Sequence, residues 1–185
     1  MVLGIGFISW AIFSMWTYTG SPATSAAANA VKVESDPSLV LTATDKLYPV
    51  YPAEGDNIGS LTIPALTQKL PIFQGTGVKE LQEGVGHFSQ SVLPGEEDNC
   101  VLSGHRETVF RQLGNLKIGD QLIVQTSAGT FTYEVTGTRI VHADDKTVIV
   151  PTDHAVLTMT TCYPFYTPGY SPDRYIVSAA LVKSK

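Results

Sequence analysis

The chain has 185 residues, of which 12 are basic and 17 are acidic, and its formal net charge is −5. An apolar content of 43% with only 16% charged residues excludes a disordered polyelectrolyte, and the acidic balance argues against a nucleic-acid-binding protein. Sixteen glycines and eleven prolines indicate many turns, which favours a β-rich fold over a helical bundle. Two cysteines are too few for a disulfide scaffold or a four-cysteine zinc site.

The N-terminal part of the chain is unusually apolar. The first 31 residues contain no charged side chain, and Val2–Trp16 is almost wholly hydrophobic. A bilayer core takes about 20 apolar residues, so this run is just long enough to cross a membrane. We therefore predict that residues 1–19 form a membrane anchor. The alternative is a cleaved signal peptide, because Ala28-Asn29-Ala30 has the small residues of a signal-peptidase site.

Residues 20–57 are rich in Ser, Ala, Thr and Pro and show no sustained hydrophobic period, which predicts a linker that lets the following domain stand off a membrane. The remainder, 58–185, is long enough for one domain. It contains two predicted short helices, Val78–Glu83 and Val109–Leu116. Seven β-prone runs surround them: Gly59–Pro64, Leu70–Gln74, Asn99–Ser103, Gln121–Gln125, Thr130–Val141, Ala155–Thr161 and Arg174–Val182. Many short strands without βαβ alternation predict a mostly β domain that forms a closed or nearly closed barrel.

The two cysteines occupy different positions in this pattern. Cys162 stands at the end of a predicted strand and is followed by Tyr163-Pro164, so we expect it at the rim of the barrel, where catalytic groups are commonly mounted. Cys100 lies in a predicted buried strand and is interpreted as a small hydrophobic residue. The structural alternative is a disulfide between Cys100 and Cys162.

A cysteine nucleophile needs a basic neighbour, because a thiol is only slightly ionised at neutral pH. His105 follows the strand that contains Cys100, directly after Gly104, where we expect glycine to permit an unusual backbone turn. Histidine can accept the thiol proton and return it to a leaving amine. The other histidines are competing candidates, with His87 interpreted as a surface group and the remaining two placed in a polar loop: His142 and His154.

Arg174 opens the last predicted strand, twelve residues after Cys162. A strand, a loop and a returning strand would bring the two residues together at the same rim. A guanidinium could then donate hydrogen bonds to the oxyanion that develops during acyl transfer. The other three arginines are interpreted as surface residues: Arg106, Arg111 and Arg139.

Together these motifs resemble the sortases, which are membrane-anchored cysteine transpeptidases of Gram-positive bacteria. The similarity rests on Gly-His-Arg at 104–106, Thr-Met-Thr-Thr-Cys at 158–162 and Arg174, and it covers roughly residues 57–182. The family signature is T-L-x-T-C, and Met159 replaces the leucine at similar volume. The N-terminal anchor, the short linker and the C-Y-P-F sequence are most similar to class D.

The resemblance implies an eight-stranded closed barrel of sortase type with two or three short helices. It also implies that the protein is an enzyme of the hydrolase class, a thiol protease. It implies Cys162 as nucleophile, His105 as general acid/base and Arg174 as oxyanion or substrate-positioning residue, and we expect Thr161 and Tyr163 to bind substrate. Cleavage of an LPxTG-like sorting signal between Thr and Gly, with transfer to an amine of peptidoglycan or pilin at the cell wall, would follow.

The same resemblance implies a single-pass membrane protein with an extracellular catalytic domain and with no cofactor or metal. Glu96-Glu97-Asp98 could bind calcium, as in some sortases of another class, but a solvated acidic loop is the preferred interpretation. Two other functions remain open. One is an exported, non-catalytic barrel that binds extended peptides, and the other is a thiol hydrolase that uses water as acceptor.

Overall fold

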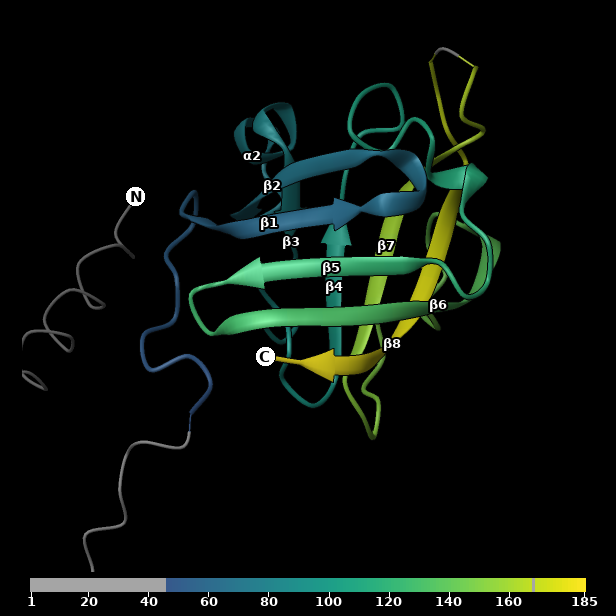
Figure 1. The fold of residues 1–185 in the computed structure, drawn as a ribbon. Coiled ribbons are helices and arrows are strands. Elements are labelled where there is room, and N and C mark those ends of the chain that lie inside the picture. Colours follow the sequence, from purple (N-terminus) through teal and green to yellow (C-terminus); the bar gives the residue numbers. More distant parts are fainter. Residues whose placement is uncertain (1–45, 168) are drawn as a thin grey trace, which may run out of the picture. The chain divides into compact units, whose positions relative to one another are not determined.

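The computed structural model describes residues 46–185 except Pro168. Eight strands close into a barrel in the order β1-β2-β3-β4-β7-β8-β6-β5, and β5 pairs back to β1 (Figure 1). This confirms the prediction of a mostly β, closed eight-stranded barrel. The strands are β1 (Asn57–Ile63), β2 (Gln68–Gln74), β3 (Val85–His87), β4 (Asn99–Ser103), β5 (Gln121–Thr126), β6 (Gly129–His142), β7 (Val156–Tyr163) and β8 (Asp173–Ser184).

Seven of these strands match the predicted runs, with boundaries that differ by at most two residues. The strand that was not predicted is β3, which has three residues and is buried along its whole length. Such a short buried strand shows no hydrophobic alternation that a sequence pattern could reveal. The predicted helix Val78–Glu83 is confirmed as α2.

The predicted helix Val109–Leu116 is wrong. The structure has consecutive turns here, followed by the 3₁₀ helix η3 (Leu113–Asn115), and a second 3₁₀ helix, η2 (Pro64–Leu66), follows β1. Gly114 and Asn115 have low helix propensity, which weakens the end of the predicted helix. A Cβ atom at Gly114 would lie 2.7 Å from the Phe165 ring, so packing also requires glycine there.

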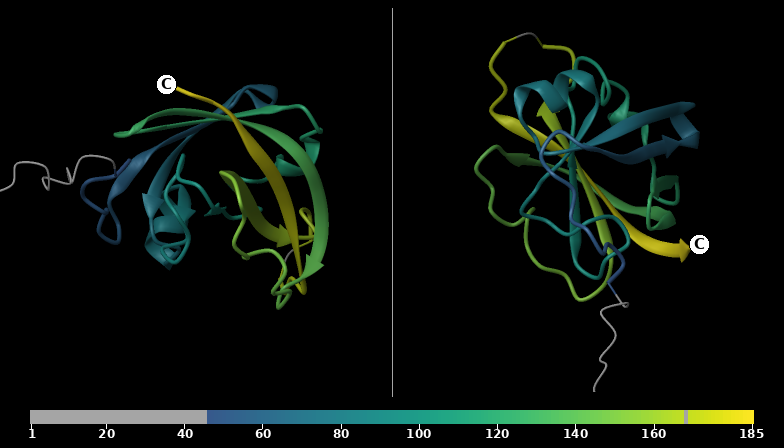
Figure 2. Two further views of the ribbon diagram at one scale, coloured as in Figure 1. Left: turned by 90° about the horizontal axis from the view of Figure 1, so that it is seen from below. Right: turned by 90° about the vertical axis from the view of Figure 1, so that its left-hand side faces the viewer.

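Six of the eight neighbouring strand pairs are antiparallel, whereas β2 pairs with β3 and β4 pairs with β7 in parallel. Parallel neighbours end at the same edge of a sheet. Ser103 at the end of β4 is aligned with Thr160 near the end of β7. Figure 2 shows β6 and β8 running side by side and bending around the barrel. The residues that follow β4 and those that end β7 therefore share one end of the barrel.

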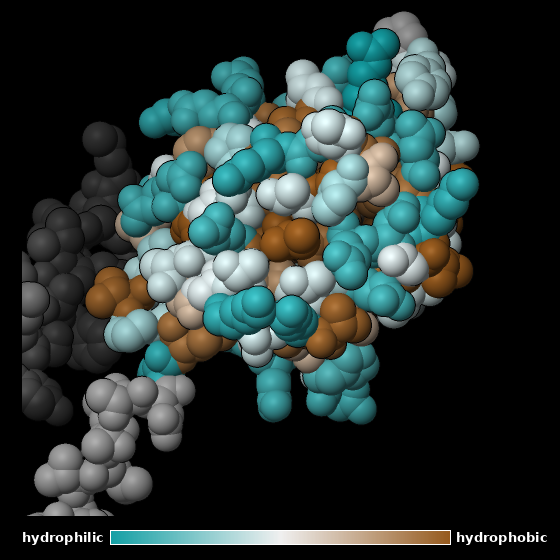
Figure 3. Space-filling model, in the orientation of Figure 1, coloured by the Kyte–Doolittle hydropathy of each residue, from teal (hydrophilic) through white to brown (hydrophobic). Residues whose placement is uncertain are grey.

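The barrel interior is filled by alternate residues of the strands. On β6, Phe131, Tyr133 and Val135 are buried, while Glu134 and Thr136 between and beyond them are exposed. Full burial of one large apolar side chain contributes about 1.5–3 kcal/mol. On the face seen in Figure 3, hydrophilic and hydrophobic side chains are interspersed, as expected for the solvated outer faces of antiparallel strands.

The last residues of the predicted linker contact the barrel. The Tyr48 hydroxyl donates to the carbonyl of Pro94 at 2.6 Å and lies 2.9 Å from the Thr126 hydroxyl. Burial raises the pKa of Tyr48 to about 12. The Asp56 carbonyl accepts a bond of 2.8 Å from the amide of Gln74. The segment before β1 is therefore attached to the domain from Tyr48 onward.

The predicted anchor Val2–Trp16 lies outside the described residues. Within residues 46–185, Pro168 excepted, the helices are too short or too polar to span a bilayer.

Candidate active site

Cys162 is near the end of β7, and Arg174 on β8 is its cross-strand partner. The expected pairing of these two residues at one rim is thus present in the structure. Cys162 is partly exposed and Cys100 is 1% exposed, and both are unpaired thiols, so the structure contains no disulfide between them. Burial raises the pKa of the Cys100 thiol. The interpretation of Cys100 as a small buried residue is therefore confirmed.

His105 is exposed and stands two residues after β4, in the segment 104–110 that we call the histidine turn and that is hydrogen-bonded to β7. The Gly104 amide donates to the Thr160 carbonyl at 3.2 Å, and the Thr161 hydroxyl donates to the Gly104 carbonyl at 2.7 Å. Both bonds hold the turn against the strand that carries Cys162. The histidine turn and Cys162 therefore lie at the same end of the barrel.

The reason for glycine at position 104 differs from the one expected. Gly104 is not among the glycines with positive φ, so the turn does not require a left-handed backbone. A Cβ atom at Gly104 would instead lie 2.7 Å from both the Phe110 ring and a methyl group of Val109. Close packing under the histidine turn is what requires glycine here.

Arg174 is half-buried at the start of β8. Its Nη1 atom donates to the carbonyls of Ser171 at 3.1 Å and Asp173 at 2.9 Å. These bonds hold one side of the guanidinium, and the Nε and Nη2 donors have no hydrogen-bond partner among the described residues. The group can therefore offer directed donors at the rim beside Cys162.

The two residues expected to bind substrate have different environments. Thr161 is 3% exposed, and its hydroxyl is used in the bond to Gly104. Tyr163 is half-buried in an aromatic cluster, where its ring centroid lies 5.7 Å from that of Phe165 and 6.3 Å from that of Tyr175. This cluster borders Cys162 on the side where β7 ends.

His87 is completely buried, so its interpretation as a surface group is wrong. Its Nδ1 atom lies 2.7 Å from Oε1 of Gln74, and its Nε2 atom lies 2.9 Å from the carbonyl of Val92. Burial lowers the pKa of His87. The residue joins β3 to its neighbours and faces the interior.

His142 and His154 are exposed, each with an aspartate beside it at 2.5 Å. The hydrogen bond to Asp144 raises the pKa of His142. His142 is the cross-strand partner of Asp173 and so lies near the start of β8.

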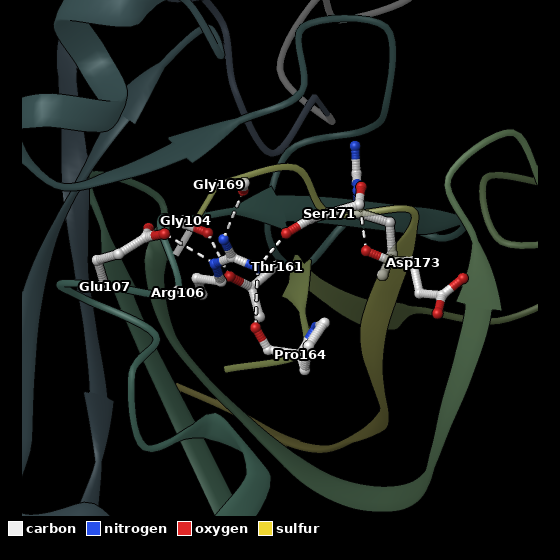
Figure 4. Close-up of polar contacts among 9 residues, drawn as sticks. Gly104, Arg106, Glu107, Thr161, Pro164, Gly169, Ser171 and Asp173 are labelled. Carbon is white, nitrogen blue, oxygen red and sulfur yellow. Dashed lines mark hydrogen bonds and ion pairs between the residues drawn. The ribbon is translucent and has the colours of Figure 1, made fainter. Parts of the chain in front are cut away.

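The interpretation of Arg106 as a surface arginine is wrong, because the residue is only 3% exposed. It donates to Oε1 of Glu107 at 2.7 Å, to the carbonyls of Pro164 at 2.8 Å and Gly169 at 2.9 Å, and to the hydroxyl of Ser171. Figure 4 shows this guanidinium enclosed by its acceptors, beside the bond between Thr161 and Gly104. Sequence reasoning missed this residue, and its place next to His105 was the only signal that pointed to it.

Two carboxylates of the acidic loop 96–98 accept hydrogen bonds from backbone amides outside the loop. A Glu96 carboxylate oxygen accepts the Leu93 amide at 2.8 Å, and an Asp98 oxygen accepts the amides of Asn99 and Thr152, each at 2.7 Å. Among the residues that the structure describes, no three His, Cys, Asp or Glu side chains are grouped so that they could hold a metal ion.

The barrel and its rim define a class of protein: a closed β-barrel domain with a partly exposed thiol between a histidine turn and a strand-borne arginine. The Sortase domain model matches residues 61–182, and the chain belongs to the sortase family. It is 46% identical over 127 residues to Sortase D of Bacillus subtilis (strain 168). That match covers 68% of this chain and 64% of the Bacillus protein, which is less than two thirds of its length. The resemblance seen in the sequence is thus confirmed.

Solved structures agree with this assignment. The X-ray structure of Clostridium perfringens sortase C with the C-terminal cell wall sorting motif has a TM-score of 0.65 and 32% identity, and covers 71% of this chain and 73% of that one. The Clostridium perfringens Sortase D5 transpeptidase has a TM-score of 0.65 and 29% identity, and covers 72% of this chain and 83% of that one.

Proposed function

We propose that this chain is a cysteine transpeptidase that cleaves an LPxTG-like sorting signal between Thr and Gly and transfers the protein to an amine acceptor. The observation that carries the proposal is the pairing of Cys162 with Arg174 at the barrel end where the His105 turn is fastened to β7. The structure of Clostridium perfringens sortase C with the C-terminal cell wall sorting motif supports the substrate class.

The reaction has two half-reactions. The Cys162 thiolate attacks the threonyl carbonyl carbon, and the resulting oxyanion accepts hydrogen bonds from Arg174. His105, which has taken the proton of the thiol, gives it to the glycyl nitrogen as the Thr–Gly bond breaks, which leaves a thioester on Cys162. His105 then takes a proton from the incoming amine, which attacks the thioester carbonyl and releases the thiolate.

Two neighbours of the nucleophile have supporting roles in this proposal. Tyr163 presents its ring to the substrate from the aromatic cluster at the end of β7. Thr161 contributes through the bond that fixes the histidine turn, since its hydroxyl is buried and already bound to Gly104.

We further propose that residues 1–19 anchor the protein in the membrane and that residues 20–57 extend from it, so that the catalytic domain faces outward. The acceptor is then an amine of peptidoglycan or pilin at the cell wall. Sequencing the N-terminus of the cell-associated protein tests the anchor. A mature N-terminus at Val31 would show a cleaved signal peptide and leave the catalytic proposal intact.

The catalytic proposal is tested with the full chain in detergent, an LPxTG-type peptide library and an amine such as triglycine. Mass spectrometry should detect a thioester on Cys162, and then a product in which the peptide up to Thr is joined to the amine. Cys162→Ala is the control and should form neither. A product that ends in a free threonyl carboxylate despite excess amine would indicate a thiol hydrolase. Peptide binding without any covalent intermediate would indicate a binding module.

A further inference from the structure

Arg106 is buried, although it lies at the end of the barrel next to the exposed His105. The side chain is 3% exposed, and Glu107, the carboxylate that it contacts, has a side chain that is 60% exposed. The hydrogen bond from Arg106 lowers the pKa of Glu107, yet that carboxylate remains largely solvated. A buried guanidinium is costly unless its donors are satisfied, so its backbone and hydroxyl acceptors must carry much of that role.

The backbone and hydroxyl acceptors all come from the connection between β7 and β8, residues 164–172, of which the structure describes all but Pro168. Pro164 stands two residues after Cys162, and Ser171 stands three residues before Arg174. Arg106 binds both of these residues and also Gly169. One planar guanidinium thus fixes the two ends of the connection that leads from the thiol to the arginine.

Ser171 joins the two arginines. Its hydroxyl accepts a bond from Nη1 of Arg106, and its carbonyl accepts one from Nη1 of Arg174 at 3.1 Å. Displacement of Ser171 would therefore also move an acceptor that holds Arg174. Figure 4 shows Ser171 between the Arg106 guanidinium and the start of β8 at Asp173.

We propose that Arg106 is a positioning residue that acts on Arg174 through Ser171 and holds the β7–β8 connection against the histidine turn. The proposal rests on the proposed transpeptidase function, because it assigns to Arg174 a part in turnover. Arg106 itself touches neither the thiol nor the substrate in this mechanism. Lysine should not replace it, since one ammonium cannot reach acceptors that are spread around a planar fork.

The first test needs no substrate. Tyr166 and Tyr170 in the connection are 75% and 84% exposed, so chymotrypsin can cleave there once the backbone loosens. Arg106→Gln and Arg106→Lys should both speed this cleavage at least tenfold, and Ser171→Ala should speed it less. Arg111→Gln is the matched control, because Arg111 is exposed on the same turn segment.

The second test is a double-mutant cycle on turnover. If Arg106 acts through Arg174, Arg106→Gln should lower kcat at least tenfold in the wild type but less than threefold when Arg174 is already alanine. KM should change less than kcat, and the melting temperature should be compared for every variant. An arginine that only stabilises the fold would lower activity by the same factor in both backgrounds.

The outcomes separate the two proposals. Cleavage of the connection in Arg106→Gln at the rate of Arg111→Gln would overturn the positioning role, and so would equal factors in the two arms of the cycle. Faster cleavage together with unequal factors supports it. If the wild-type chain transfers no peptide, the proposed function has failed; the chymotrypsin result then still decides whether Arg106 holds the connection.

Discussion

Replacement of Gly104 by alanine should destabilise the barrel and impair the histidine turn. The new Cβ atom would lie 2.7 Å from the Phe110 ring and 2.7 Å from a Val109 methyl group, whereas carbon atoms normally approach to about 3.5–4.0 Å. Phe110 is 1% exposed and has no room to retreat, so the backbone of the turn must give way. Overpacking of this kind costs about 1–3 kcal/mol.

Part of that cost is offset in the unfolded chain. Alanine restricts the unfolded backbone relative to glycine by about 0.4–1 kcal/mol, and φ at Gly104 is not positive, so alanine adds no left-handed strain. The net loss in the free energy of unfolding should be about 1–2 kcal/mol. Because Gly104 is bonded to β7 through both its amide and its carbonyl, the shift should also displace His105 and lower turnover at temperatures where the variant is fully folded.

Urea unfolding followed by fluorescence measures the effect, and an unchanged m value would show that the two-state comparison holds. Gly137→Ala is the matched control, because it lies on β6 with open space around the added Cβ and no positive φ, and it should be as stable as the wild type or up to about 1 kcal/mol more stable. A Gly104→Ala variant with wild-type stability and wild-type turnover would show that packing under the turn does not require glycine.

Iodoacetamide should modify Cys162 with loss of activity and leave Cys100 unmodified in the folded protein, because Cys100 is buried and its pKa is raised; peptide mapping in which Cys100 reacts first would reverse the assignment. Arg174→Ala should lower kcat by about 10²–10³, with Arg174→Lys in between, because an oxyanion donor acts in the transition state; steady-state kinetics within a few-fold of the wild type would exclude that role. Stability should fall as the pH drops below about 6.5, because burial lowers the pKa of His87 in the folded state and the unfolded state then binds the proton more readily. Thermal melts from pH 5 to pH 8 should show this loss, and His87→Gln should flatten the profile; an equal slope in both proteins would place the titrating group elsewhere.

Sequence patterns predicted the strands of the barrel because each strand is marked by the residues within it and by the turns that flank it. The alternation along β6 and the spacing between Cys162 and Arg174 each reflect one or two consecutive strands. Turns between such strands leave few alternatives, so their boundaries were predicted to within two residues.

The residues that were misjudged depend on distant partners. The acceptors of Arg106 in the β7–β8 connection lie 58, 63 and 65 positions further along the chain, and its local partner Glu107 would also suit an exposed arginine. His87 is similar, since its partner Gln74 is thirteen positions away and β3 is too short to show a pattern. Where residues far away in the sequence cover a side chain, its burial is visible only in the folded structure.

The parallel pairing of β4 with β7 has a consequence for the order of events during folding. His105 follows β4 and Cys162 lies on β7, and these two strands are not consecutive in the chain. Arg174 is added only when β8 pairs with β7. Before these strands are in register, the thiol has neither the histidine nor the arginine beside it. An immature chain therefore lacks the assembled site, and the return of peptide transfer during refolding would time the closure of the barrel.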